Sequence, residues 1–117
     1  MLSTTASSLL SLLDEENQNL QIYALSQLNQ IVDDFWAEIS ESIEKIEVLY
    51  EDEKFEKREL AAIVASKVYY HLGDLSDAMN CALNSGDLFE IRKRTEYTET
   101  LVCLFFILYL FSHSPQC

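Results

Sequence analysis

The fold of this chain is decided by residues 65–87, which have the sequence ASKVYYHLGDLSDAMNCALNSGD. Apolar and small residues recur at spacings of three and four on both sides of Gly73, as they do on the buried face of a helix. A glycine that can adopt a positive φ commonly ends a helix, and Asp74 or Ser76 can cap the next one. The stretch therefore predicts a helix, a tight turn at Gly73 and a second helix over about residues 75–84.

The same stretch has the spacing of a repeat hairpin. Tyr69, Gly73 and Ala78 have the relative positions of the tyrosine, glycine and first alanine in a tetratricopeptide-type hairpin. The match is partial, because Ala82 replaces the usual large residue and no proline follows. One such hairpin favours an α-solenoid, in which each hairpin buries its face on its neighbours and the stack offers a binding surface.

Apolar periodicity extends the helical pattern to both sides, with helices expected over about residues 4–13, 16–34, 36–50 and 55–71. The junction at 33–36 fits either a sharp bend or a continuous helix. The expected buried stripes are Leu20, Ala24, Leu28, Ile31 and Phe35; Trp36, Ile39, Ile43, Ile46 and Tyr50; Leu60, Ala61, Val64, Ala65, Val68 and Leu72; and, after the turn, Leu75, Ala78, Met79, Ala82 and Leu83. We therefore predict an all-α chain of five or six helices, packed as antiparallel helical hairpins in an α-solenoid (tetratricopeptide-like) fragment.

The composition supports this class and excludes others. Two glycines and one proline in 117 residues are too few for the many turns of a β-sandwich or barrel. The formal net charge of −12 repels a phosphate backbone, so no nucleic-acid partner is expected. Between Asp33 and Glu59 there are 11 acids and 4 bases, which favours a solvated helix face over a patch for a basic partner.

No residue pattern points to catalysis. The chain has no phosphate-binding glycine loop, no nucleophile elbow and no metalloprotease helix, and its histidines, His71 and His113, lie far apart. Its three cysteines, Cys81, Cys103 and Cys117, form no CxxC pair, and Cys81 is expected to act as a small buried hydrophobe. We therefore expect no enzyme, no catalytic, cofactor-binding or metal-binding residues, no cofactor and no small-molecule substrate.

The C-terminal segment differs from the rest of the chain. A basic triplet, Arg92 to Arg94, is expected to form a solvated turn, and residues 101–117 have the sequence LVCLFFILYLFSHSPQC. Its run of apolar residues is shorter than the roughly 17 to 25 residues that span a bilayer, so membrane insertion is not favoured. The N-terminus lacks the basic start of a signal peptide.

Four strings carry a resemblance to a known family: SLLDEEN at 11–17, FWAEISESIEKIEVLYEDEKF at 35–55, ASKVYYHLGDLSDAMNCALNSGDLF at 65–89 and TEYTET at 95–100. Over about residues 1–100 the chain resembles the N-terminal region of the family of 26S proteasome non-ATPase regulatory subunit 1. These proteins are the large scaffold subunits in the base of the regulatory particle. The basic triplet and the segment after Thr100 depart from that family's pattern.

The resemblance implies a non-catalytic scaffold fragment of the proteasome regulatory particle, linked to ubiquitin-dependent protein degradation in the cytoplasm and nucleus. It implies regulatory-particle subunits as partners and a helical rod over residues 1–100. The central toroid and receptor-docking segment of the family are absent from this sequence, so their functions are not implied. Residues 101–117 are expected to be a divergent apolar tail, from an alternative exon, intron read-through or a gene-model artefact. The alternatives are a free-standing helical adaptor and a small membrane-associated protein.

Overall fold

The computed structural model describes residues 6–113, and within them it contains six α-helices, one short 3-10 helix and no strand. The elements are α1 (Ala6–Leu12), α2 (Gln18–Ser40), α3 (Ile43–Glu51), α4 (Arg58–Leu72), α5 (Leu75–Asn84), η1 (Gly86–Leu88) and α6 (Glu96–His113). The predicted all-α class and the predicted five or six helices are confirmed.

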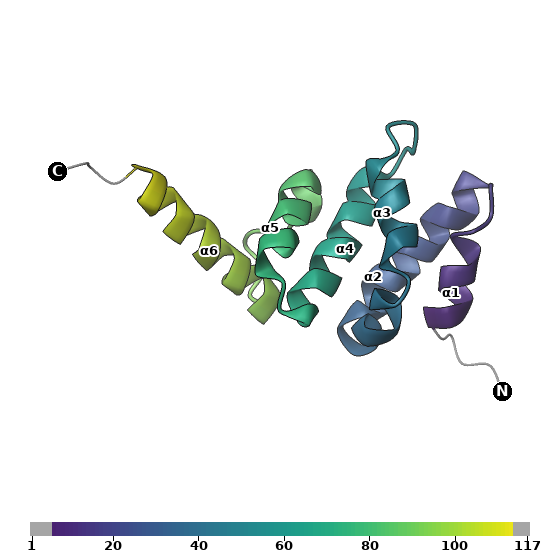
Figure 1. Ribbon diagram of the computed structural model, residues 1–117, viewed down its shortest axis with the longest axis horizontal. Helices are drawn as coiled ribbons and strands as arrows, with labels where there is room; N and C mark the ends of the chain where they lie inside the picture. Colours follow the sequence, from purple (N-terminus) through teal and green to yellow (C-terminus); the bar gives the residue numbers. More distant parts are fainter. Residues whose placement is uncertain (1–5, 114–117) are drawn as a thin grey trace.

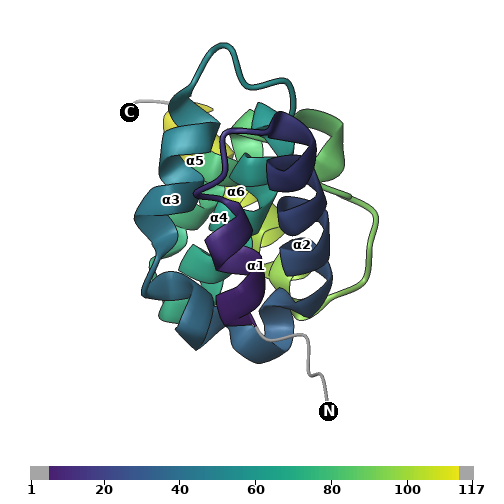
Figure 2. The ribbon, with the colours of Figure 1, turned by 90° about the vertical axis from the view of Figure 1, so that its right-hand side faces the viewer.

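The helices stand side by side in an elongated row (Figure 1), and the body measures 62 × 32 × 24 Å. Helix α4 lies at the centre and contacts α2, α3 and α5, while α1 packs on α2 and α6 contacts α5. Viewed along the row, α2 and α3 flank α1, and the loop before α4 crosses above them (Figure 2). This stacking is compatible with the predicted α-solenoid fragment.

The hairpin between α4 and α5 has the predicted turn. Gly73 adopts a left-handed conformation, with φ 84° and ψ 5°. The Gly73 and Asp74 N–H groups donate to the carbonyl oxygens of Tyr70 and Tyr69 at 3.0 and 2.9 Å, which satisfies the end of α4. The Asp74 carboxylate accepts from the N–H of Asp77 at 3.2 Å and caps α5. Both expected roles, the positive-φ glycine and the aspartate cap, are confirmed.

Helix α4 is buried on more sides than the sequence stripe indicates. The predicted residues Ala61, Val64, Ala65 and Val68 are buried, and so are Ala62, Ile63 and Ser66. Neighbours on several sides explain this, because a helix enclosed by others has no purely solvent-facing side. The prediction that Leu72 is buried is wrong, since that residue ends the helix and is about half exposed. The predicted start at Phe55 is also wrong: Phe55 is buried in the preceding turn and α4 begins at Arg58.

The junction at residues 33–36, which the sequence left open between a sharp bend and a continuous helix, is a continuous but kinked helix. The two helices that were expected to meet near residues 34 and 36 therefore meet later in the chain. Helix α2 runs from Gln18 to Ser40, with a kink at Phe35, where φ is −120° and ψ is 18°. The chain turns at residues 41–42 instead, and α3 begins at Ile43. Because the side chain of Asn17 accepts from the N–H of Asn19 at 2.8 Å, α2 also begins two residues later than predicted.

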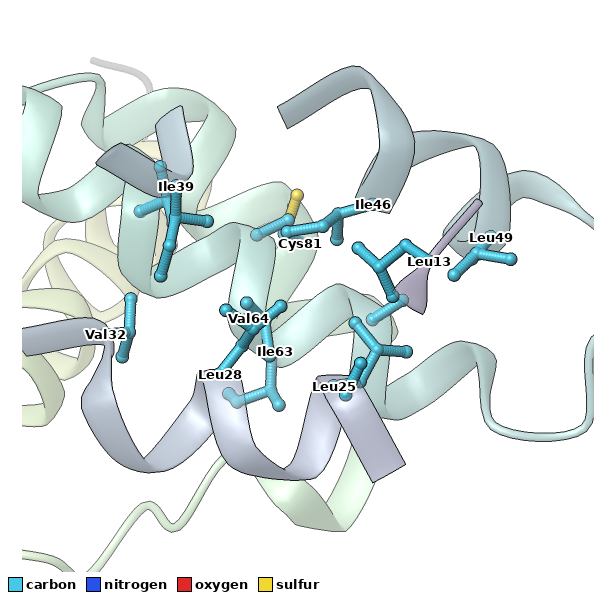
Figure 3. Close-up of a cluster of buried hydrophobic side chains, with 14 of the residues drawn as sticks. Leu13, Leu25, Leu28, Val32, Ile39, Ile46, Leu49, Ile63, Val64 and Cys81 are labelled. Carbon is cyan, nitrogen blue, oxygen red and sulfur yellow. The ribbon is translucent and has the colours of Figure 1, made fainter. Parts of the chain in front are cut away.

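The buried face of α2 is rotated from the predicted stripe. Ala24 and Leu28 are buried as expected, but Leu25 and Val32 are buried too, while Leu20 and Phe35 are exposed. Helix α2 packs on α1 as well as on α4, so its buried face is the one that points toward both of these helices. Figure 3 shows Leu25, Leu28 and Val32 of α2 facing Ile63 and Val64 of α4.

The remaining stripes are largely confirmed. Ile39 and Ile46 are fully buried, and Trp36, Ile43 and Tyr50 pack against the core while partly exposed. In α5, Ala78 and Ala82 are buried as predicted and Met79 packs against the core. Leu83 is exposed, so its predicted burial is wrong. Cys81 is buried in the core instead, which confirms the expectation that it acts as a small buried hydrophobe.

Candidate interaction surface

A polar cleft of about 540 Å³ lies beside the C-terminal half of α4. Lys67, Tyr70 and His71 of α4 form one wall, and the loop after η1 with the first turn of α6 forms the other. Packing against α2 and α5 fixes the position of α4. Because α6 also packs on α5, residues 95–98 lie opposite α4 across the cleft. The cleft has no signature in the sequence, because its two walls are about thirty residues apart along the chain and no local pattern joins them.

Lys67 is the partly buried cation of the cleft. Its ammonium group donates to Oδ1 of Asn29 at 2.8 Å and lies 6.0 Å from the centroid of the Tyr97 ring. Burial lowers the pKa of Lys67, against the smaller opposing effect of the Asp33 carboxylate. Its direct contacts are thus an amide and an aromatic face, and these hold the ammonium group in place in the wall of the cleft.

The other charged groups of the cleft pair with one another. Asp33 lies 3.0 Å from Nε2 of His71, and Lys93 lies 3.3 Å from Glu90. The Tyr70 hydroxyl donates to Oε1 of Glu96 at 2.9 Å. Each of these groups therefore has a hydrogen-bonding or ion-pairing neighbour within the fold.

His71 sits in the last turn of α4, where the sequence places it as a helix-end residue. Its ring stacks on Trp36, with centroids 5.6 Å apart and planes inclined by 11°, and contacts Tyr70 edge-on at 5.1 Å. These contacts give the imidazole a structural role between α2 and α4. The side chain of the other candidate, His113, lies outside the described residues.

A buried hydroxyl pair holds the cleft together. Ser66 donates through Oγ to the carbonyl oxygen of Ala78 at 2.6 Å, and the Tyr97 hydroxyl lies 2.7 Å from the same Oγ. Because the single Ser66 proton is directed to Ala78, Tyr97 is the donor in the second bond. Burial is the main cause that raises the pKa of Tyr97 to about 12. This chain of bonds joins α4, α5 and the start of α6.

The cysteines differ in environment. Cys81 is buried, and that burial is the main cause that raises the pKa of its thiol to about 11, so it is a poor nucleophile. Cys103 is exposed on α6, and Cys117 lies outside the described residues. Over residues 6–113, no group of three His, Cys, Asp or Glu side chains is arranged to hold a metal ion.

The second exposed feature is the C-terminal half of α6. This half of the helix extends away from the end of the row (Figure 1). Leu101 is buried and Leu104 and Phe105 pack against the core, whereas the large apolar residues from Phe106 to Phe111 are exposed. None of the helices described over residues 6–113 combines the length and hydropathy needed to cross a bilayer. The basic triplet lies in the exposed loop before α6, as predicted.

The model of the family described as 26S proteasome subunit RPN2, N-terminal domain, matches residues 4–115. The chain belongs to this family. The resemblance found in residues 11–17, 35–55, 65–89 and 95–100 is thereby confirmed.

Individual relatives give the same result. The 26S proteasome non-ATPase regulatory subunit 1 of Drosophila melanogaster is 56% identical over 99 residues, which cover 85% of this chain and 10% of the relative. The regulatory subunit rpn2 of Schizosaccharomyces pombe is 48% identical over 99 residues, with the same coverage. The regulatory subunit RPN2 of Saccharomyces cerevisiae is 42% identical over 113 residues, or 97% of this chain and 12% of the relative.

The chain therefore spans about a tenth of the length of the curated relatives that it matches. The family match and the alignment with the Saccharomyces cerevisiae relative both continue past Thr100, into the apolar segment. The proposed boundary between residues 100 and 101 falls inside the continuous helix α6.

Proposed function

We propose that this chain is a non-catalytic helical interaction element of the proteasome regulatory particle, with other regulatory-particle subunits as its partners. The observation that carries the proposal is the family match over residues 4–115, together with relatives named as non-ATPase regulatory subunits of the 26S proteasome. Its role would be structural, within ubiquitin-dependent protein degradation, and its place the cytoplasm and nucleus.

The side-chain arrangement supports a binding role without catalysis. In the cleft, Asp33, Glu90 and Glu96 contact His71, Lys93 and Tyr70, so no carboxylate there is set beside an unpaired nucleophile. The acidic surface also argues against nucleic acid as the partner, since the net charge is −12. The polar lining of the cleft suits a folded partner with hydrogen-bonding side chains.

We place the docking function in residues 1–100 and regard 101–117 as a separate apolar segment. The cleft lies wholly before residue 100, which supports this division. Leu101, Leu104 and Phe105 join the segment to the body, so the segment begins as a continuation of α6 rather than as a detached tail.

Co-purification tests this function. The chain, carrying an N-terminal affinity tag, is expressed in cultured cells, purified, and separated on a glycerol gradient that resolves proteasomes from free proteins and membranes. Regulatory-particle subunits are expected in the eluate and in the heavy fractions. A variant with Tyr70→Ala and Lys93→Glu, which alters the cleft, is expected to recover less of them than a control with Lys57→Glu in the connector before α4.

Two outcomes contradict the proposal. Sedimentation of the chain as a free protein would favour the helical adaptor, and its recovery with membranes would favour the membrane-associated alternative. Equal recovery with the cleft variant and the control would remove the cleft from the docking surface.

A further inference from the structure

Lys67 is a partly buried cation without a counter-ion in the fold. Its ammonium group donates to Oδ1 of Asn29 at 2.8 Å, and the centroid of the Tyr97 ring lies 6.0 Å away. Within the described residues 6–113, no carboxylate lies at ion-pairing distance from this group. Charged groups that are removed from water are normally paired, because an unpaired one loses its hydration without replacement. Lys67 therefore lacks the anion that its position requires.

The other lysines of the chain are in a different situation. Lys45 and Lys93 each have a carboxylate partner, at 2.8 and 3.3 Å. Lys54 and Lys57 are exposed on the connector before α4, where water solvates the ammonium group. Among these five lysines, all of them within the described residues, Lys67 combines partial burial, a place in the wall of a cleft and the lack of a carboxylate partner.

The carboxylates that line the cleft do not supply this counter-ion. Asp33 lies 3.0 Å from the His71 ring, and Glu90 pairs with a lysine of its own loop. The side chains of Asp33 and Glu90 are 81% and 65% exposed, so water screens their charge and they repel an incoming anion only weakly. Burial lowers the pKa of Lys67 by more than the Asp33 carboxylate raises it. The attraction from within the fold is thus smaller than the cost of burying the charge.

Two other helices hold Lys67 in a fixed position. Its neighbours Asn29 and Tyr97 belong to α2 and α6. The Tyr97 hydroxyl lies 2.7 Å from Oγ of Ser66, and the Tyr97 ring contacts Tyr70 edge-on at 5.4 Å. Because these contacts order the ammonium group before a partner arrives, little side-chain entropy is left to lose on binding.

We propose that the cleft receives an aspartate or glutamate side chain of another regulatory-particle subunit, whose carboxylate pairs with the ammonium group of Lys67. This inference rests on the proposed function, and it names the chemistry of the partner at the same cleft. A volume of about 540 Å³ admits such a side chain with its flanking residues, since binding sites commonly measure about 300 to 1,000 Å³. A charge-assisted hydrogen bond in this partly buried position is stronger than one on an exposed surface.

Zero-length cross-linking tests the pairing directly. The tagged chain is purified from cultured cells with its bound subunits and treated with a water-soluble carbodiimide, which joins a lysine amine to a carboxylate that touches it. Peptide mass spectrometry is expected to find Lys67 joined to an aspartate or glutamate side chain of a regulatory-particle subunit. If such subunits are present but Lys67 is joined only to Asp33 or Glu90 of its own chain, only to a C-terminal carboxylate, or to nothing, the proposal is overturned.

Substitutions measure what the charge contributes. Lys67→Met removes the charge from a long side chain and is expected to lower the recovery of regulatory-particle subunits about tenfold or more, because the partner's carboxylate loses its counter-ion. Lys67→Arg keeps the charge and is expected to recover more than Lys67→Met. Lys57→Met is the matched control on the exposed connector and is expected to bind as the wild-type chain does. Lys67→Gln, which can still donate to Asn29, replaces Lys67→Met if that variant loses its helical circular dichroism.

The outcomes separate this inference from the proposed function. A wild-type chain that recovers no regulatory-particle subunit contradicts the proposed function, and this inference with it. Subunits that are recovered equally by Lys67→Met and Lys57→Met contradict the carboxylate pairing alone and leave the proposed function standing. Recovery by Lys67→Arg that is no better than recovery by Lys67→Met also contradicts the pairing, since the cation is then not what the partner recognises.

Discussion

The hydroxyl groups of Ser66 and Tyr97 lie 2.7 Å apart in the buried interior, although the two residues are 31 positions apart in sequence. Ser66 is fully buried and Tyr97 is 9% exposed. Through Ser66, this pair also reaches the carbonyl oxygen of Ala78. The two side-chain hydroxyls therefore link three helices, α4, α5 and α6. They hold α6 to the body by a polar contact, in addition to the apolar contact of the buried Leu101.

The two members of this pair are expected to respond unequally to removal. Tyr97→Phe removes the hydroxyl that donates to Ser66, while the bond from Ser66 to Ala78 remains. The free energy of unfolding should therefore fall by about 1 kcal/mol. Ser66→Ala removes the hydrogen-bonding neighbour of both the Tyr97 hydroxyl and the Ala78 carbonyl. The free energy of unfolding should then fall by about 1 to 3 kcal/mol. Urea unfolding of both single variants and the double variant measures the difference. Equal costs, with no coupling energy, would contradict the proposed network.

Stability is expected to fall at alkaline pH because of Tyr97. Its pKa is raised from 10.0 to about 12 by burial, so the folded state holds the phenol proton more tightly than the unfolded state. This contribution is complete below about pH 10 and is lost as pH rises toward 12. Tyr97→Phe should therefore reduce the slope of the unfolding free energy against pH in this range, and the loss that it removes across the whole range is about 3 kcal/mol at most. An unchanged slope would count against a buried phenol.

The turn between α4 and α5 makes a separate prediction. A Cβ added at Gly73 meets no heavy atom within 4 Å, so any cost of substitution comes from its φ of +84° rather than from a clash. Gly73→Val is expected to destabilise the chain by about 1 to 3 kcal/mol, since β-branched residues avoid this region. Gly73→Asn is the control, because asparagine tolerates a left-handed conformation. Thermal unfolding should rank glycine above asparagine and asparagine above valine.

The sequence was most informative where local chemistry decides the structure. Gly73 and Asp74 define a turn by themselves, because a positive φ and a side-chain cap are properties of single residues. The family resemblance likewise depends on continuous strings. The junction at residues 33–36 stayed open between a bend and a continuous helix, because nothing in the local sequence distinguishes a kink at Phe35 from a helix end. The structure shows that the helix continues past the kink to Ser40.

The cleft could not be derived from the sequence, for a different reason. Lys67 resembles an ordinary solvent-facing residue of a helix, and its contacts with Asn29 and Tyr97 exist only after α2, α4 and α6 have assembled. Ser66 offered the one available signal, a hydroxyl within a run of small, buried residues. A hydroxyl in such a run needs an acceptor and can receive a donor, but the sequence does not say from which helix.

The two described cysteines provide a final prediction. Cys81 is buried, and burial is the main cause that raises the pKa of its thiol to about 11, so its alkylation should be slow. Cys103 is exposed on α6, so it should be alkylated much faster. Peptide mass spectrometry after timed iodoacetamide treatment reports both sites, and in urea, where the chain is unfolded, the two rates should converge. Alkylation of Cys81 as fast as that of Cys103 in the folded chain would contradict the buried position of Cys81.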